Sequence, residues 1–285
     1  MVLEAAGACA LFAVLRLLPL DWASGLCGSL ARTVGPRLGV SRRARRNIGR
    51  AMPELDDAAI ERIVAGTWDN LGRVIGEYPH LNKFHVYEPG GRVEIADPEL
   101  TRDQLHQGKA TLFFSAHYGN WELVTLGGTQ AGFDVLDIYR AANNPLVDRL
   151  INRARRPIGA ELVPKTGFAP RQALAAVRSG RHIGMLVDQK MNEGIPVPFF
   201  GHPAMTAPLL ARLALRFDCP VVPVRVIRRP GAHFLLATEP ALHYQRTGDT
   251  EADTLALMTQ VNQVIERWIR ERPEHWLWLH NRWPD

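Results

Sequence analysis

A histidine and a glutamate separated by four residues, His117 and Glu122, are the side chains in this sequence best placed for acid–base chemistry. The segment from Thr111 to His117 has the pattern of a buried strand, and the Gly-Asn pair that follows is typical of a turn. Glu122 falls in the first turn of the next predicted helix, where the helix dipole stabilises a carboxylate. If the loop folds back, Glu122 can hold the imidazole in the tautomer whose other nitrogen accepts a proton. The pattern predicts a general base with an orienting carboxylate and no protein nucleophile.

The spacing of this pair is weak evidence by itself, because ten histidines give roughly one such match by chance. A second match, His280 with Asp285, runs through Pro284 to the last residue and has no strand before it. The strand–turn–helix context therefore favours His117 and Glu122. A hydrogen-bonded structural histidine beside a capped helix is the alternative interpretation of the same residues.

Other catalytic motifs are missing from the sequence. It has no G-x-S-x-G elbow, P-loop, dinucleotide fingerprint or H-E-x-x-H motif, and its three cysteines are not paired for zinc. Ser115 precedes His117 by two residues, so a Ser–His hydrolase is a further hypothesis. We expect no metal and no cofactor.

Short apolar runs alternate with helical patterns from about residue 93 to the end of the chain. This alternation predicts a single α/β sandwich domain over 93–285, with a mostly parallel or mixed sheet flanked by helices. Reactive groups gather at the carboxyl ends of the strands in such folds. Strands are expected at Val93–Ala96, Thr111–Ser115, Val135–Tyr139, His182–Val187, Val221–Ile227 and Phe234–Thr238. Helices are expected at Asn120–Gln130, Pro145–Arg155, Arg171–Arg178, Pro208–Arg216 and Asp253–Arg270.

The first 50 residues carry the whole positive charge excess of the chain. Eight arginines stand there against two carboxylates, whereas the rest of the chain holds 26 basic and 27 acidic side chains. The apolar segment Val2–Leu20, interrupted by Glu4 and Arg16, precedes the basic cluster Arg42–Arg50. We expect residues 1–22 to be a short membrane span or a helix on the membrane surface, with the arginines attracted to anionic lipid. The positive-inside bias then places the body in the cytoplasm.

Residues 23–92 are expected to form a basic and amphipathic helical segment. Apolar residues from Ile60 to Tyr78 recur at three- and four-residue steps, which predicts a helix over 56–79. We expect this helix to pack on the body, and membrane contact is the alternative. A buried core helix is the alternative for the apolar N-terminus. Nucleic-acid binding is disfavoured, because no aromatic residue interleaves the arginines and no binding-fold signature accompanies them.

The composition excludes several classes of protein. A hydrophobic fraction of 46% argues against disorder. A mean hydropathy of −0.11 argues against a polytopic membrane protein. The three cysteines Cys9, Cys27 and Cys219 are too few and too scattered for a disulfide scaffold.

Five segments, in order, resemble the bacterial lipid A biosynthesis acyltransferases, the late lauroyl and myristoyl transferases of lipopolysaccharide assembly. The resemblance covers nearly the whole chain. Each segment alone is only modestly specific for the family, whereas the five together are highly specific. They are Arg42–Arg50 with Asn47, leading into the helix with Trp68, Gly72 and Glu77; His117–Glu122; Tyr139-Arg140 with Asn144–Asp148 and Arg155; Asp188-Gln189 with Val197–Gly201 and Pro203–Thr206; and Pro273–His280 with Arg282-Trp283.

The resemblance implies transfer of a fatty acyl chain, usually from acyl carrier protein, to a hydroxyl of a lipid A precursor at the cytoplasmic face of the cell inner membrane. His117 would then be the base that deprotonates the acceptor hydroxyl, which belongs to a 3-hydroxyacyl chain already on the disaccharide. Glu122 would orient His117 and balance its charge. The alkoxide would attack the donor thioester directly, so no acyl-enzyme is needed. Further site residues implied as substrate contacts are Asn120, Arg140, Arg155 and Asp188. An arginine there could bind a phosphate or stabilise the oxyanion, and Asp188 could instead pair with an arginine.

Two alternatives to this function stay open. The first keeps the chemistry but uses a phospholipid, glycolipid or aminolipid as acceptor, and the second is a non-catalytic lipid-binding protein on the same fold. The chain departs from the usual pattern at Tyr118, where the family generally has Phe or a similar residue. Three tryptophans near the C-terminus, Trp276, Trp278 and Trp283, are expected in the core or at the membrane interface.

Overall fold

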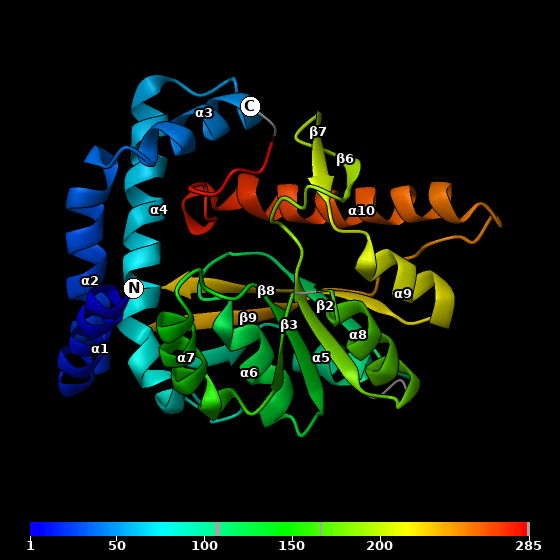
Figure 1. Cartoon of the computed structure of the whole chain (residues 1–285), viewed down its shortest axis with the longest axis horizontal. Coiled ribbons are helices and arrows are strands. Elements are labelled where there is room, and N and C mark those ends of the chain that lie inside the picture. Colours follow the sequence, from blue (N-terminus) through cyan, green and yellow to red (C-terminus); the bar gives the residue numbers. More distant parts are fainter. Residues whose placement is uncertain (106–108, 166, 284–285) are drawn as a thin grey trace.

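A seven-stranded sheet forms the centre of the structure, a computed structural model that describes residues 1–105, 109–165 and 167–283 (Figure 1). The strand order is β1-β9-β8-β2-β5-β3-β4. The strands from β8 to β4 are parallel, β9 is antiparallel to β8, and β1 is parallel to β9. This confirms the expected mostly parallel, mixed sheet. The strands are β1 (Val93–Ile95), β2 (Leu112–Ser115), β3 (Val135–Tyr139), β4 (Glu161–Pro164), β5 (His182–Leu186), β8 (Val221–Arg229) and β9 (His233–Thr238).

Helices cover both faces of this sheet (Figure 1). Successive side chains of a strand point to opposite faces. In β2, Leu112 and Phe114 therefore join one core, whereas Phe113 joins the other. Helices α8 (Ala169–Arg178), α9 (Leu209–Phe217) and α10 (Thr250–Glu271) lie on the first face, and α5 (Pro98–Leu105) and α6 (Glu122–Gln130) lie on the second. Helix α7 (Pro145–Ala154) follows β3.

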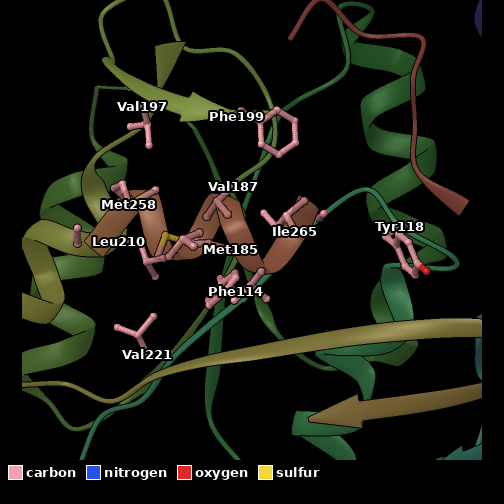
Figure 2. Close-up of a cluster of buried hydrophobic side chains, with 14 of the residues drawn as sticks. Phe114, Tyr118, Met185, Val187, Val197, Phe199, Leu210, Val221, Met258 and Ile265 are labelled. Carbon is pink, nitrogen blue, oxygen red and sulfur yellow. The ribbon is translucent and has the colours of Figure 1, made fainter. Parts of the chain in front are cut away.

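The larger core is built around α10. Figure 2 shows Met258 and Ile265 of this helix beside Phe114 and Met185 of the sheet, and all four side chains are buried. Trp268 of α10 stacks on Phe114 with ring centroids 6.1 Å apart. Each fully buried apolar side chain of this size contributes roughly 1.5–3 kcal/mol to folding. The sheet that carries the strand ends is thus supported from one side by a long apolar helix.

Two of the N-terminal helices pack directly into this core. Ile48 of α3 and Val64 of α4 are fully buried members of the cluster around α10. Helix α4 begins after Asp56, whose carboxylate accepts a hydrogen bond from the Ala59 N–H at 2.7 Å. The helix confirms the one expected over 56–79. The N-terminal helices are α1 (Val2–Leu17), α2 (Leu20–Val34), α3 (Ser41–Ala51) and α4 (Asp57–Glu77).

The first two helices expose many of their large apolar side chains. Helix α1 buries only Ala5 and Leu15, so the structure does not show the buried core helix considered as an alternative. Within residues 1–105, 109–165 and 167–283, no helix combines the length and the apolar character that a membrane span requires.

The structure contains elements that the sequence pattern did not indicate. The six expected strands and the expected helices are present, with ends shifted by a few residues. Helix α5, strand β4 and a separate hairpin of β6 (Ile195–Phe199) and β7 (His202–Thr206) were not expected. Proline cannot donate a backbone hydrogen bond, so a segment that contains it is a weaker candidate for a strand. Strand β6 contains both Pro196 and Pro198. Its turn is made by Phe200 and Gly201, both with positive φ, the conformation that a two-residue hairpin turn requires.

Candidate active site

His117 and Asp188 meet at the carboxyl edge of the sheet. His117 follows β2, Asp188 follows β5, and these strands are parallel neighbours. The Nδ1 atom of His117 lies 2.9 Å from Asp188 Oδ1. The backbone N–H of His117 donates to Asp188 Oδ2, also at 2.9 Å. One carboxylate thus holds both the main chain and the ring of the histidine.

Asp188 is itself fixed by further contacts. The Trp276 Nε1–H donates to Asp188 Oδ2 at 2.8 Å, and His280 Nε2 lies 3.3 Å from the Asp188 carbonyl oxygen. Burial would raise the pKa of Asp188, but the neighbouring His117 and His280 outweigh burial and hold that pKa well below its usual range. Burial also lowers the pKa of His280 to about 4, so its ring is neutral near pH 7. Asp188 is therefore a buried, ionised acceptor for the Nδ1–H of His117.

This arrangement leaves the other ring nitrogen of His117 as a proton acceptor. With Nδ1 protonated toward Asp188, Nε2 carries the lone pair. The Gln189 side-chain nitrogen lies 3.4 Å from Nε2, a long contact that a substrate hydroxyl can replace. The His117 side chain keeps 16% of its surface exposed, whereas that of Asp188 is fully covered. The pair can therefore remove a proton from a group that approaches the sheet edge.

Glu122 does not occupy the position that the sequence pattern predicted for it. Its carboxylate binds Arg155 through two hydrogen bonds of 2.8 and 2.5 Å. It also accepts from the Tyr78 hydroxyl at 2.5 Å and from the Trp121 Nε1–H at 3.0 Å. Glu122 is the first residue of α6, and the helix aims its side chain at the end of α7. The carboxylate at the imidazole of His117 is Asp188, because β5 lies beside β2.

Arg155 is a structural partner of Glu122 in this site. Its side chain is 12% exposed, and its guanidinium lies over the rings of Tyr78 and Tyr139 at 5.9 and 5.4 Å from their centroids. Burial would lower the pKa of Arg155, but Glu122 and Tyr78 raise it above its usual value. Bidentate arginine–carboxylate pairs are geometrically specific. The pair therefore ties the end of α7 to the beginning of α6.

Asn120 lies just before α6, whose N-cap residue is Trp121, and is enclosed by the protein. Its side-chain oxygen accepts from the Glu122 N–H at 3.3 Å, and its side-chain nitrogen donates to Glu77 at 2.8 Å. Glu77 is fully buried and also pairs with Arg228 of β8. Asn120 is 1% exposed. Its amide therefore holds the turn between His117 and α6 against α4.

The turn after His117 requires glycine at position 119. Gly119 has a φ of +58°, and a Cβ atom there would lie 1.9 Å from the carbonyl oxygen of Val226 in β8. The Gly119 N–H donates to the carbonyl of His275, and the Leu277 N–H donates to that of His117, both at 3.0 Å. The C-terminal segment thus runs directly along the His117 turn.

The three C-terminal tryptophans are buried, as expected for core residues. Trp276, Trp278 and Trp283 are at most 2% exposed. No sequence pattern indicated that Trp276 also holds Asp188. The density of aromatic and polar residues in 273–283 is the one signal that could have indicated this role.

Arg140 and Lys165 lie at the same edge of the sheet as His117. Tyr139 and Pro164 are partners in the register of β3 and β4, and the residues that follow them are Arg140 and Lys165. The Lys165 N–H donates to the Tyr139 carbonyl at 2.7 Å, which extends this pairing. Lys165 is exposed, and the charges of Asp188 and Arg140 act on its pKa in opposite directions. No sequence pattern indicated a role for Lys165.

Ser115 forms no catalytic pair with His117. Its hydroxyl is buried and has no hydrogen-bond partner among the residues that the structure describes. In the same described ranges, no group of three or more His, Cys, Asp or Glu side chains could hold a metal ion. The second histidine–acid pair found in the sequence was His280 with Asp285. His280 lies beside Asp188, and Asp285 is outside the described residues.

Comparison with known proteins identifies the family. A family model described as bacterial lipid A biosynthesis acyltransferase matches residues 4–285. The chain belongs to this family. It is 25% identical over 249 residues to the lipid A biosynthesis lauroyltransferase of Escherichia coli (strain K12), covering 83% of this chain and 76% of that protein. It is 24% identical over 276 residues to the myristoyltransferase of the same strain, covering 95% and 83%.

A third relative extends the similarity to another species. The chain is 22% identical over 277 residues to lipid A biosynthesis acyltransferase 2 of Shigella flexneri, covering 94% of this chain and 86% of that protein. The resemblance that five ordered segments indicated is thereby confirmed, and the protein is an acyltransferase.

Proposed function

We propose that this acyltransferase moves a fatty acyl chain from an acyl carrier protein thioester to a hydroxyl of a lipid A precursor in lipopolysaccharide biosynthesis. The named activities of its relatives support the substrate class. The chemistry rests on one observation, the contact of His117 Nδ1 with buried Asp188 that leaves Nε2 as a proton acceptor. The expected pair of His117 and Glu122 is replaced in this proposal by His117 and Asp188.

The proposed reaction is a direct transfer in one site. Nε2 of His117 takes the proton of the acceptor hydroxyl as that oxygen attacks the thioester carbonyl carbon. The tetrahedral intermediate collapses, the C–S bond breaks, and the imidazolium returns the proton to the departing sulfur. Asp188 stabilises the imidazolium while the reaction proceeds. No protein side chain is acylated, because the substrate hydroxyl is the nucleophile.

The other site residues divide into two roles. Arg140, together with Lys165, is proposed to bind a phosphate group of the donor or acceptor, because two cations leave neighbouring strands side by side near Asp188. Arg155 and Asn120 are proposed to position the site instead of contacting substrate, because Glu122 and Glu77 already engage their polar atoms.

We further propose that α1 and α2 hold the enzyme on the anionic cytoplasmic surface of the cell inner membrane. The buried side of α2 holds Leu20 and the small residues Ala23, Ser24 and Gly28. Its outer side carries Trp22, Leu26 and Leu30, which are 73%, 60% and 64% exposed. Large apolar residues at four-residue steps form a stripe suited to the membrane interface. The arginine excess in residues 1–50 adds attraction to anionic lipid.

Mass spectrometry of lipid A tests the substrate assignment. A strain that lacks this protein is expected to lose one secondary acyl chain from lipid A, and purified enzyme with acyl carrier protein thioester should add it back to the isolated precursor. Unchanged lipid A together with transfer to a phospholipid, glycolipid or aminolipid would replace the acceptor but keep the chemistry. Absence of transfer to every acceptor would contradict the proposed activity and favour a lipid-binding protein.

A further inference from the structure

The side-chain amide of Gln189 lies next to the catalytic nitrogen of His117. Gln189 follows Asp188 beyond the carboxyl end of β5, and its side-chain nitrogen is 3.4 Å from His117 Nε2. Among the residues that the structure describes, the Gln189 side chain makes no other hydrogen bond. Its amide can therefore change partner when a substrate hydroxyl takes the lone pair of Nε2.

The main chain on both sides of Gln189 is fixed by hydrogen bonds. The carbonyl oxygen of Asp188 lies 3.3 Å from His280 Nε2. Two residues after Gln189, the Met191 N–H donates to the carbonyl of Met205 in β7 at 3.1 Å. The side chain of Gln189 is partly buried between these anchors. The amide thus has a defined place before substrate binds, as a preorganised donor requires.

Two other N–H donors close to His117 are already held by carboxylates. The ring of Trp121 lies beside that of His117, with centroids 5.1 Å apart, but its indole N–H donates to Glu122 at 3.0 Å. The indole N–H of Trp276 donates to the carboxylate that orients His117. Gln189 differs from both, because no carboxylate binds its amide. Its N–H groups are therefore available to a negative charge that develops during the reaction.

We propose that Gln189 is a catalytic residue whose side-chain N–H stabilises the oxyanion of the tetrahedral intermediate. This inference rests on the proposed direct transfer. As the acceptor oxygen bonds to the thioester carbonyl carbon, its proton passes to His117 Nε2, and the electron pair of the C=O bond moves onto the carbonyl oxygen. That oxyanion and the attacking oxygen share one carbon atom, so a donor 3.4 Å from Nε2 can reach it. When the C–S bond breaks, the pair returns to the carbonyl and the proton passes from the imidazolium to sulfur.

An uncharged donor suits this position. Two charges develop together in the intermediate, an imidazolium at His117 and an oxyanion beside it. A cation in place of Gln189 would stabilise the oxyanion but oppose the imidazolium, and a carboxylate would have the reverse effects. A side-chain amide donates to the oxyanion without opposing protonation of the base, and glutamine is one of the residues that serve in oxyanion holes.

Steady-state kinetics of Gln189 variants test this role. Gln189→Ala should lower kcat by about 10²–10³-fold and leave both KM values within a few-fold, because the lost contact exists only in the intermediate. Gln189→Asn should recover part of kcat, since it keeps the amide on a shorter side chain. Gln263→Ala changes an exposed glutamine on α10 and serves as the matched control. A wild-type kcat in Gln189→Ala would overturn the proposal, and so would a raised KM for the acceptor with unchanged kcat, which would make Gln189 a binding residue for the hydroxyl.

Chemical modification of His117 tests the placement of Gln189 without requiring an active variant. Diethyl pyrocarbonate reacts with the uncharged imidazole, and mass spectrometry measures modification of His117 as a function of pH. Gln189→Glu puts a carboxylate beside Nε2 that stabilises the imidazolium, so modification should require a higher pH, whereas Gln263→Glu should leave the profile unchanged. An unshifted profile in Gln189→Glu would overturn the placement. Wild-type enzyme that transfers no acyl chain would contradict the proposed function, whereas full transfer by Gln189→Ala would contradict only this inference.

Discussion

Asp188 accepts the Nδ1–H of His117 at 2.9 Å although the two residues lie 71 positions apart in the chain. The same carboxylate accepts the His117 backbone N–H and the indole N–H of Trp276. Three donors from two segments therefore fix the carboxylate before any substrate binds. A histidine held in this way is oriented for proton transfer without a rearrangement of the site.

Replacing His117 with alanine should abolish the base. We expect His117→Ala to lower kcat about 10²–10⁴-fold or more, since general base catalysis contributes about that much. The variant should stay folded but lose some stability, because buried Asp188 then keeps only the backbone N–H of residue 117 and the indole N–H of Trp276 as partners. Purified variants can be compared by acyl transfer and by thermal unfolding. Near-normal transfer by His117→Ala would contradict the assignment of the base.

Asp188→Asn tests the orienting carboxylate. An amide in place of Asp188 can present its NH₂ group to Nδ1 and select the unproductive tautomer, which should lower kcat by about 10²–10⁴-fold. KM should stay within a few-fold, because Asp188 is buried and does not face substrate. Glu122→Gln serves as the comparison variant, and we expect its kcat to fall clearly less than that of Asp188→Asn. A larger kcat defect in Glu122→Gln would instead support the pair first expected from the sequence.

The ion pair of Glu122 and Arg155 should act on stability. Breaking a buried pair from one side leaves an uncompensated charge and costs about 3–5 kcal/mol, so Arg155→Met should lower the free energy of unfolding by an amount of that order. The double variant Glu122→Gln with Arg155→Met should recover part of this loss, because neither charge is then left alone. Urea unfolding of wild type, Glu122→Gln, Arg155→Met and the double variant measures the coupling free energy between the two side chains. Strictly additive effects would argue against direct pairing.

The carboxyl of Asp137 should make stability depend on pH in a specific direction. Burial raises its pKa from the ordinary value of 3.8 to about 6, so ionisation is less favourable in the folded protein. Both forms carry the proton at pH values well below 4, and the full loss in free energy of unfolding is reached at pH values well above 6. Asp137→Asn should therefore become more stable than wild type between pH 4 and 6, by roughly 2–3 kcal/mol at the upper end. Urea unfolding at several pH values checks this, and a constant difference would contradict it.

Charge placed on the outer stripe of α2 should weaken membrane binding. Trp22→Glu and Leu26→Glu add a charge at exposed positions, so folding should be preserved while partition into anionic vesicles falls about tenfold or more. Leu255→Glu changes an exposed apolar residue on α10 and is the matched control. Co-sedimentation with vesicles measures binding. Equal loss in all three variants would indicate that α2 has no special part in it.

Several features of the fold and site follow from local sequence alone. Alternating apolar runs indicated the α/β class and the six expected strands, because strand periodicity and flanking turns are local properties. His117 was predictable as a residue at the end of a strand, and Asn120 as a side chain that bonds the start of the next helix, since both depend on neighbours within a few positions. The five ordered segments that resemble the family predicted the acyltransferase activity.

Tertiary structure decided which groups meet. The order β2-β5-β3-β4 brings Asp188 to His117 and places Arg140 beside Lys165, and no local pattern specifies the order of strands in a sheet. The start of α6 turns Glu122 toward Arg155, although its spacing from His117 suggested a direct pair. Trp276 reaches Asp188 from a segment 88 residues away, because the C-terminal chain returns across the sheet edge. Sequence thus determined the residue types and their places at strand ends and helix starts, whereas long-range packing determined which side chains they contact.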